Sequence, residues 1–287
     1  MECVDFYAKK IAIVFNEGVK NPYPVLQILE QILLDKGANP EVLEMHEMKY
    51  GFDFVFAVGG DGTILHVSKF YAITKTPVLG INLGRLGYLS QVNSDNIKYA
   101  VDCVSENKFS VEKRMMLISS DRYALNDFVI KGASQTRTSR FVLYINDKFV
   151  CDYIADGLIV STPTGSTAYG LSAGGPILSP MIDAIEIVPI CPHTLTARPL
   201  VIPASEKIKI TTSADEEKSF NLIADGAENH VVNSEVIIQK ADYYAHLALL
   251  NDDAFYSVLR DKLHWGVSPK SLWLLQFTLK TISWLMI

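Results

Sequence analysis

Residues 57–63 read Ala-Val-Gly-Gly-Asp-Gly-Thr, which places one carboxylate among three glycines. Glycines let backbone N–H groups approach a phosphate without a Cβ in the way. Behind them, apolar residues recur with helical spacing, and a helix N-terminus favours negative charge. Asp61 would repel a phosphate unless it holds a metal or takes a proton. The segment therefore predicts chemistry on a phosphate at Asp61, with the phosphate bound by Gly59, Gly60, Gly62 and Thr63.

This turn has a structural alternative, in which it is a tight connection and Asp61 only caps the following helix. It is not a P-loop, because no Gly-Lys-Ser/Thr follows it, and it does not fit Gly-x-Gly-x-x-Gly. Two glycines around one aspartate exceed what a cap requires, so the sequence favours a functional turn. A second glycine loop (Gly80, Gly84, Gly87) follows another apolar run, where α/β sheets bind ligands.

Two adjacent polar residues, Asn126 and Asp127, interrupt an apolar run that we expect to be a strand over 123–130. Neighbours on a strand point to opposite faces, so one of the two faces inward or toward a partner domain. A buried amide or carboxylate is costly without partners. A ribose diol would satisfy both residues, whereas a turn or a bulge is the structural alternative.

The segment 162–176, Thr-Pro-Thr-Gly-Ser-Thr-Ala-Tyr-Gly-Leu-Ser-Ala-Gly-Gly-Pro, is the richest stretch of the chain. Its small residues predict a short helix whose first N–H groups could bind an anion or a carboxamide. Tyr169 could stack on a flat ring. Ser166 is not in a Gly-x-Ser-x-Gly motif, which argues against a serine hydrolase.

Weaker signals come from two Asp-Gly pairs and from the histidines. Asp156-Gly157 and Asp225-Gly226 each follow Ile-Ala, and a hairpin turn and a ligand contact are equally good explanations for both. The six histidines show no metal spacing. His66 is the exception of interest, because it lies one turn into the helix behind the glycine turn.

The N-terminal part must position these groups. Short buried strands are expected at 11–15, 54–58 and 77–81, and helices at 22–36 and from the glycine turn to about residue 73. Alternating strands and helices predict an α/β domain, with a parallel sheet and flanking helices, over residues 1–110.

From about residue 109 onward the sequence pattern consists of many short β-like runs, so we expect a mostly β domain over 111–266. The end of this domain could return to the first domain. These runs are at 116–119, 123–130, 141–145, 158–161, 185–190, 208–212, 220–223 and 236–239, with a helix at about 252–263. Residues 267–287 form an apolar tail, strongest from 271 onward. The strongly apolar stretch 271–287 is shorter than the ~20 residues of a spanning helix, so we expect docking on the core or on another subunit rather than a membrane anchor.

Composition bounds the class of protein. The 287 residues, 49% of them hydrophobic and 20% charged, suggest about two globular domains. A net charge of −6 offers no basic stripe for nucleic acid. Four dispersed cysteines and the absence of a long apolar stretch in residues 1–10 predict reduced thiols, no signal peptide and a cytoplasmic protein.

Taken together, the motifs resemble NAD kinase of the bacterial type, over roughly residues 9 to 266. The resemblance is carried, in this order along the chain, by 59–63, 80–89, Asn126-Asp127, Asp156-Gly157, 162–176 and 192–202. The glycine turn alone is shared with lipid kinases, and a related turn occurs in phosphofructokinases. The Thr-Pro-Thr-Gly-Ser-Thr-Ala-Tyr stretch is more specific.

The resemblance implies transfer of the γ-phosphoryl group of ATP to the adenosine ribose 2′-hydroxyl of NAD, giving NADP, with a divalent metal, Mg²⁺ for preference. It implies Asp61 as proton acceptor and a homodimer or homotetramer, and it identifies no metal ligands. The positions that would contact the dinucleotide are Asp61, Gly62, His66, Asn126, Asp127, Arg137, Asp156, Thr167, Ala168, Tyr169, Gly170, Leu171 and Ser172.

Three positions depart from the family pattern. Asp127 stands where Glu is usual, Ala227 where Gln often follows Asp-Gly, and Ile154 where a basic residue is common. Two other functions remain open at this point. A lipid kinase, of diacylglycerol or sphingoid type, would share the glycine turn, and the apolar tail would suit its substrate. A dinucleotide-binding module would bind NAD without turning it over.

Overall fold

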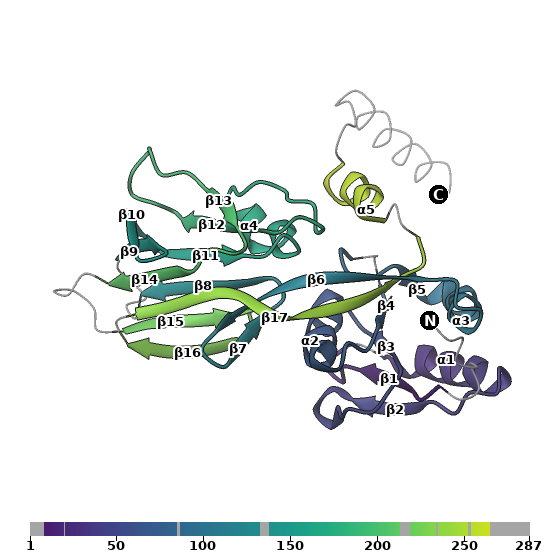
Figure 1. Ribbon diagram of the computed structural model, residues 1–287. Coiled ribbons are helices and arrows are strands. Elements are labelled where there is room, and N and C mark those ends of the chain that lie inside the picture. Colours follow the sequence, from purple (N-terminus) through teal and green to yellow (C-terminus); the bar gives the residue numbers. More distant parts are fainter. Residues whose placement is uncertain are drawn as a thin grey trace, which may run out of the picture.

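The computed structural model describes residues 9–19, 21–84, 87–132, 138–212, 219–233, 235–251 and 254–264. In Figure 1 an α/β part, purple to blue, lies beside a β-rich part, teal to green. Two long strands run between them, β6 (Ser110–Ser119) and β17 (Glu235–Leu249). The expected fold class, an α/β domain followed by mostly β structure, is confirmed.

The α/β part is built on a parallel sheet with strand order β4-β3-β1-β2. Its strands are β1 (Ile11–Phe15), β2 (Glu41–Glu44), β3 (Phe54–Val58) and β4 (Val78–Asn82), and the two-residue β5 (Val92–Asn93) pairs with β4. Every residue of β1, β3 and β4 is buried, because helices cover both faces of the sheet.

Helices α1 (Tyr23–Asp35) and α3 (Ile97–Ser105) pack on one face of this sheet, and α2 (Asp61–Tyr71) packs on the other. Three short 3-10 helices join these elements: η2 (Met45–Glu47), η3 (Ala72–Thr74) and η4 (Ser94–Asn96). The first turn of α2 follows β3 directly, so the carboxyl end of that strand carries the glycine turn.

The β-rich part contains a six-stranded antiparallel sheet with order β13-β12-β11-β8-β15-β16. Its strands are β8 (Asp127–Gly132), β11 (Gly157–Ser161), β12 (Ala184–Ile190), β13 (Leu200–Pro203), β15 (Ser219–Ala224) and β16 (Glu228–Asn233). Between β11 and β12 the chain forms η5 (Gly165–Thr167) and α4 (Tyr169–Ser172).

A second layer of strands packs against this sheet. It comprises β9 (Ser139–Ile145), β10 (Lys148–Ala155), β14 (Ile208–Thr212) and the first half of β17, with β6 and β7 (Arg122–Ala124) alongside. The core between the layers is aromatic and aliphatic, with Phe128, Leu158 and Ile187 from one sheet and Phe141 and Ile208 from the other.

Strand β17 connects the two parts. Its first half pairs with β14, and Leu247 pairs with Val78 of β4, so one strand belongs to the framework of both. Its register against β6 shifts between Lys240 and Tyr244. Helix α5 (Ala254–Leu263) follows it. The predicted boundaries at residues 110 and 266 stay predictions.

The single strand expected over 123–130 is wrong. Two strands, β7 and β8, stand there with Leu125 and Asn126 between them. Because β7 pairs with β6 while β8 pairs with β11 and β15, the chain leaves one sheet and enters the other at these two residues.

The apolar tail at 267–287 lies outside the described residues. Within the described ranges, no helix is both long and apolar enough to cross a membrane.

Candidate active site

The glycine turn at 59–63 is held against the neighbouring strand. The Gly59 N–H donates to the Ile81 carbonyl at 2.9 Å, and a Cβ at Gly59 would lie 2.4 Å from Thr63 Oγ1. Gly59 is therefore required by packing. A Cβ at Gly60 or Gly62 would meet no described atom within 4 Å, so the backbone there faces open space. That space is where a phosphate could approach the first N–H groups of α2.

Asp61 is where the two glycine loops meet. Its carboxylate accepts hydrogen bonds from the N–H groups of Tyr88 (2.7 Å) and Leu89 (3.3 Å). A Cβ at Gly87 would lie 1.8 Å from Asp61 Oδ1, so only glycine fits at that position. Burial and the Asp61 charge raise the pKa of Tyr88. The carboxylate is thus oriented by the second loop and does not cap its own helix.

Asp225 organises the crossing point at Leu125 and Asn126. Its carboxylate accepts the N–H groups of Leu125, Asn126 and Asp127 at 3.1, 2.8 and 3.3 Å. Lys69 Nζ of α2 lies 3.6 Å from the same carboxylate. Asp225 and Gly226 have φ of 51° and 71° in the turn between β15 and β16. The second Asp-Gly pair is therefore a turn, and its carboxylate joins α2 to the β7–β8 junction.

A pocket of about 350 Å³ opens beside this junction, on the face of the six-stranded sheet turned away from the core. Four of the residues predicted for the site line it: Asn126, Asp127, Ala168 and Tyr169. The remaining wall is Val129, Lys131, Ile223, Asp225 and Gly226. Sequence reasoning missed Lys131, although its spacing of two and four from Val129 and Asp127 puts all three on one face of β8.

Asp127 is a buried carboxyl group within this pocket, with 4% of its surface exposed. Burial, and secondarily the charge of Asp225, raise the pKa of Asp127 to about 7. A buried carboxylate must find donors, and ribose hydroxyls could supply them.

The small residues of 162–176 allow close backbone approach to the β7–β8 junction. Thr162 donates its N–H to the Asn126 carbonyl (2.8 Å) and its hydroxyl to the Leu125 carbonyl (2.6 Å). A Cβ at Gly165 would lie 2.2 Å from the Asn126 oxygen. The Ser166 hydroxyl donates to the Pro163 carbonyl and accepts from the Leu178 N–H, which is a structural role.

The other predicted positions are more scattered. Four of them lie in η5 and α4, next to the pocket residues Ala168 and Tyr169: Thr167, Gly170, Leu171 and Ser172. Tyr169 is 40% exposed. His66 is half-buried in the second turn of α2. Asp156 is exposed between β10 and β11 and does not line the pocket. Arg137 lies outside the described residues.

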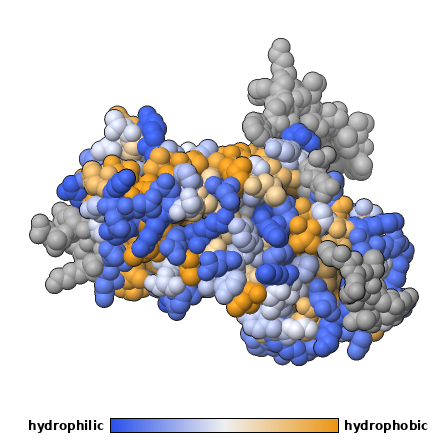
Figure 2. Space-filling model, viewed as in Figure 1, coloured by the Kyte–Doolittle hydropathy of each residue, from blue (hydrophilic) through white to orange (hydrophobic). Residues whose placement is uncertain are grey.

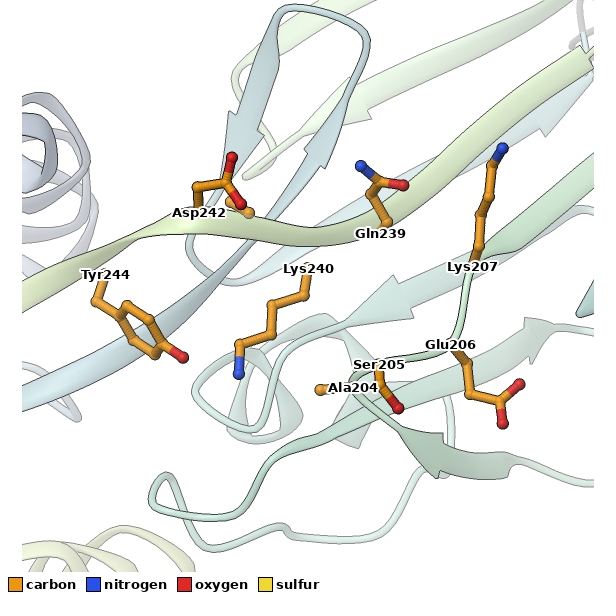
Figure 3. Close-up of a pocket in the computed structure, with 9 residues that line it drawn as sticks. Ala204, Ser205, Glu206, Lys207, Gln239, Lys240, Asp242 and Tyr244 are labelled. Atoms are coloured by element: carbon orange, nitrogen blue, oxygen red, sulfur yellow. The ribbon is translucent and has the colours of Figure 1, made fainter. Parts of the chain in front are cut away.

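A larger hollow, of about 400 Å³, is lined by none of the predicted residues (Figure 3). It lies where β17 shifts its register, and Lys240 and Tyr244 point to one side of that strand while Asp242 points to the other. Lys240 Nζ donates to Asp183 at 2.6 Å and lies 5.1 Å from the Tyr244 ring centre. Lys240 is thus already paired, and the hollow lies at the register shift of β17.

The chain matches two families in sequence. Residues 15–109 match the ATP-NAD kinase N-terminal domain, and residues 125–250 match the ATP-NAD kinase C-terminal domain. The NAD kinase of Caldanaerobacter subterraneus subsp. tengcongensis is 35% identical, and the match covers 89% of this chain and 99% of that relative. The NAD kinase of Azotobacter vinelandii is 40% identical, with 82% and 86% covered.

Solved structures agree. The crystal structure of an NAD kinase from Archaeoglobus fulgidus in complex with ATP superposes with a TM-score of 0.74 at 26% identity, covering 87% of this chain and 97% of that one. Yeast NADH kinase complexed with NADH shares the fold, with a TM-score of 0.79 at 23% identity and coverage of 91% and 89%.

An open glycine turn with a fixed carboxylate suits the class of phosphotransferases, because phosphoryl transfer asks a protein mainly for positioning and charge stabilisation. The matches name its family: the chain belongs to the NAD kinases, which phosphorylate NAD to NADP with ATP, and it is an enzyme of this kind. The resemblance stated from the motifs is confirmed. The lipid kinase and the non-catalytic module are not supported.

Proposed function

We propose that Asp61 accepts the proton of the adenosine ribose 2′-hydroxyl of NAD as the γ-phosphoryl group of ATP is transferred to that oxygen. The observation that carries this proposal is the orientation of the Asp61 carboxylate by the Tyr88 and Leu89 N–H groups, at the open end of the glycine turn. Phosphoryl transfer asks a protein mainly for positioning and charge stabilisation, and a carboxylate fixed by two donors is well positioned.

The acceptor substrate would lie in the pocket beside the β7–β8 junction. Asn126 and Asp127 would bind ribose hydroxyls, and Tyr169 would stack on a ring of NAD, since all three line the pocket. We retain Gly62, His66, Arg137, Asp156 and the segment 167–172 as further contacts with the dinucleotide. The first N–H groups of α2, with Gly59, Gly60, Gly62 and Thr63, would bind the donor phosphates.

Mg²⁺ would reach this site with ATP. This ion usually binds one or two carboxylates together with substrate phosphates and keeps several waters. Among the described residues, the one group of three possible ligands is Glu17, Glu44 and His46, which lies at the ends of β1 and β2. The glycine turn offers the Asp61 carboxylate alone, which fits an ion held largely by phosphate. When bound, the ion would neutralise charge on the transferring group.

The enzyme would work in the cytoplasm as a homodimer or homotetramer. Free thiols at Cys103, Cys151 and Cys191 support a reducing compartment. Phe149 (63% exposed) and Ile154 (43%) on β10 leave apolar surface uncovered, and Figure 2 shows apolar residues gathered along the upper edge of the β-rich part. Light scattering tests the assembly, and a monomer at micromolar concentration would contradict it.

The reaction site on NAD can be tested with a modified acceptor. We expect NADP to form from NAD, ATP and Mg²⁺. An NAD analogue that lacks the adenosine 2′-hydroxyl should bind competitively with NAD but accept no phosphate from labelled ATP. Transfer of label to this analogue would show that another hydroxyl is the acceptor and would overturn the proposal.

A further inference from the structure

Glu186 in β12 is a buried acid that the proposed mechanism does not use. It is fully buried (0% exposed), and within the described part of the chain neither carboxyl oxygen has a hydrogen-bond partner. A buried carboxylate without a partner is costly, and such a group usually takes up a proton instead. No sequence motif singled it out, so its role has to come from its surroundings.

The sheet register places Glu186 in one row with the proposed ribose-binding acid. Glu186 pairs with Ser161 of β11, and Ser161 pairs with Asp127 of β8. Residues directly opposite across antiparallel strands project from the same face. The Ser161 hydroxyl lies 3.2 and 3.0 Å from the carbonyl oxygens of Asn126 and Thr162, so it is already bonded to the backbone. The carboxyl groups of Glu186 and Asp127 therefore lie on the same face of the sheet, with strand β11 between them.

Above this row lies the segment that forms a wall of the NAD pocket. A Cβ at Gly175 would lie 1.8 Å from Glu186 Oε1, and a Cβ at Gly170 would lie 3.5 Å from Oε2. Gly175 therefore leaves the space that the Glu186 side chain fills, whereas a Cβ at Gly170 would make only an ordinary van der Waals contact with it. Glu186 thus supports α4 from below, next to Ala168 and Tyr169 of the pocket.

The electrostatics couple the two acids. Burial and then the charge of Asp127 raise the pKa of Glu186 to about 7, and the pKa of Asp127 is about 7 as well. Three residues of the neighbouring strands share the row of Glu186: Asp127 of β8, Ser161 of β11 and Val201 of β13. Asp225 and its partner Lys69 lie on the far side of Asp127. Like charges in one site cannot both ionise easily, so the first proton is lost from the pair as a unit.

We propose that Glu186 is a positioning residue for NAD: it supports the Tyr169–Ser172 helix from the strand below, and it shares one proton with Asp127, so that it competes with Asp127 for the single negative charge of the pair. This inference rests on the proposed role of Asp127 in holding a ribose. An ionised Asp127 accepts hydrogen bonds from both hydroxyls of a diol, whereas a protonated one offers a weaker set of acceptors. NAD binding should then depend on how the two acids divide one proton.

The direct test is the pH dependence of KM for NAD in Glu186→Gln. In the wild type, KM should fall as pH rises through about 7, because Asp127 becomes ionised. Glutamine keeps the volume but cannot compete for charge, so the midpoint should move at least about half a pH unit lower. At pH 8, kcat should stay within about twofold, because Glu186 does not touch the reacting atoms. Asp183→Asn, an exposed acid just before β12, is the matched control and should leave the profile unchanged.

Glu186→Met, of similar volume and without charge, serves if the glutamine variant does not fold, and it should move the midpoint in the same direction. Superimposable KM profiles of the wild type and these variants would overturn the inference. Asp127→Asn separates the two proposals. If it leaves KM for NAD unchanged, the ribose-binding role of Asp127 fails; if it raises KM about tenfold while Glu186→Gln moves nothing, only the role of Glu186 fails.

Discussion

At the scale of single residues, the site depends on side chains whose orientation is fixed by distant backbone. Asp61 is the first residue of α2, yet its carboxylate is held by N–H groups 27 and 28 positions later in the chain. Such an arrangement would pre-organise Asp61 for its proposed role as a base, because its rotamer is set before substrate arrives. Gly87 of the second loop is explained by this contact and does not need to touch a phosphate.

Gly87→Ala should test this orientation without removing the carboxylate. The new Cβ would lie 1.8 Å from Asp61 Oδ1 and must displace it, so we expect kcat to fall about 10- to 100-fold. Gly84→Ala is the matched control, because its Cβ would meet only Asn82 Oδ1 at 3.9 Å. Steady-state NADP formation and a thermal melt of both variants separate catalysis from stability. Equal activity of the two variants would contradict the account.

Sequence reasoning found the site residues that stand out from their neighbours along the chain. It missed a residue that strand pairing brings to the site. Asn126 and Asp127 stood out because polar residues interrupt an apolar run, and both line the pocket. Glu186 and Lys131 gave no such signal, because each alternates with apolar residues as any sheet residue does. The relation of Glu186 to Asp127 follows from a strand register that the motifs do not encode, whereas that of Lys131 follows from the two-residue period of β8.

At the scale of elements, the joint between α2 and the β7–β8 junction holds the two halves of the site together. Asp225 accepts three backbone N–H groups there and pairs with Lys69, and its side chain is 1% exposed. Those N–H groups belong to the point where the chain changes sheets, so no sheet ladder satisfies them. The carboxylate therefore replaces a missing strand partner and links it to a helix of the other part.

Asp225→Ala should lower the free energy of unfolding by about 3–5 kcal/mol, because it removes the ion pair with Lys69 and the acceptor of three backbone N–H groups. Asp225→Asn should cost less, since the amide oxygen still accepts. Urea denaturation measures the free energy of unfolding of both variants. A loss below about 1 kcal/mol in the alanine variant would show that the joint contributes little.

Elements with uninterrupted apolar runs were predicted best. The strands at 11–15 and 54–58 have the predicted bounds, because parallel strands buried on both faces need no alternation. The strand expected at 236–239 runs from 235 to 249, since its second half pairs with β6 and β4 and carries polar residues such as Lys240 and Asp242 at its bulge. Tertiary pairing decided that length, and local composition did not.

At the scale of the whole molecule, β17 makes one framework of two parts with different architecture. It pairs with β14 in the β-rich part and with β4 in the α/β part, and β6 runs beside it between them (Figure 1). The pocket proposed for NAD belongs to the β-rich part and Asp61 to the other. The strands shared by the two parts would therefore set the distance between the proposed acceptor site and the proposed base.

Ala245→Pro should unfold both parts together. Ala245 is fully buried and pairs with Arg114 of β6, so proline removes a ladder position in a central strand and should cost about 3 kcal/mol or more. Lys148→Pro, at the first residue of the edge strand β10, should cost far less. The urea unfolding transition measured by circular dichroism should coincide with the transition measured by loss of NAD binding. Two separate transitions would contradict a single framework.

The central claim is that one carboxylate, Asp61, removes the proton from the ribose hydroxyl. The most direct measurement is kcat for NADP formation by Asp61→Asn at saturating NAD and ATP. We predict a folded protein that binds NAD as the wild type does and loses at least about a hundredfold in kcat, the typical contribution of a general base. A folded Asp61→Asn enzyme with near-normal turnover would contradict the account.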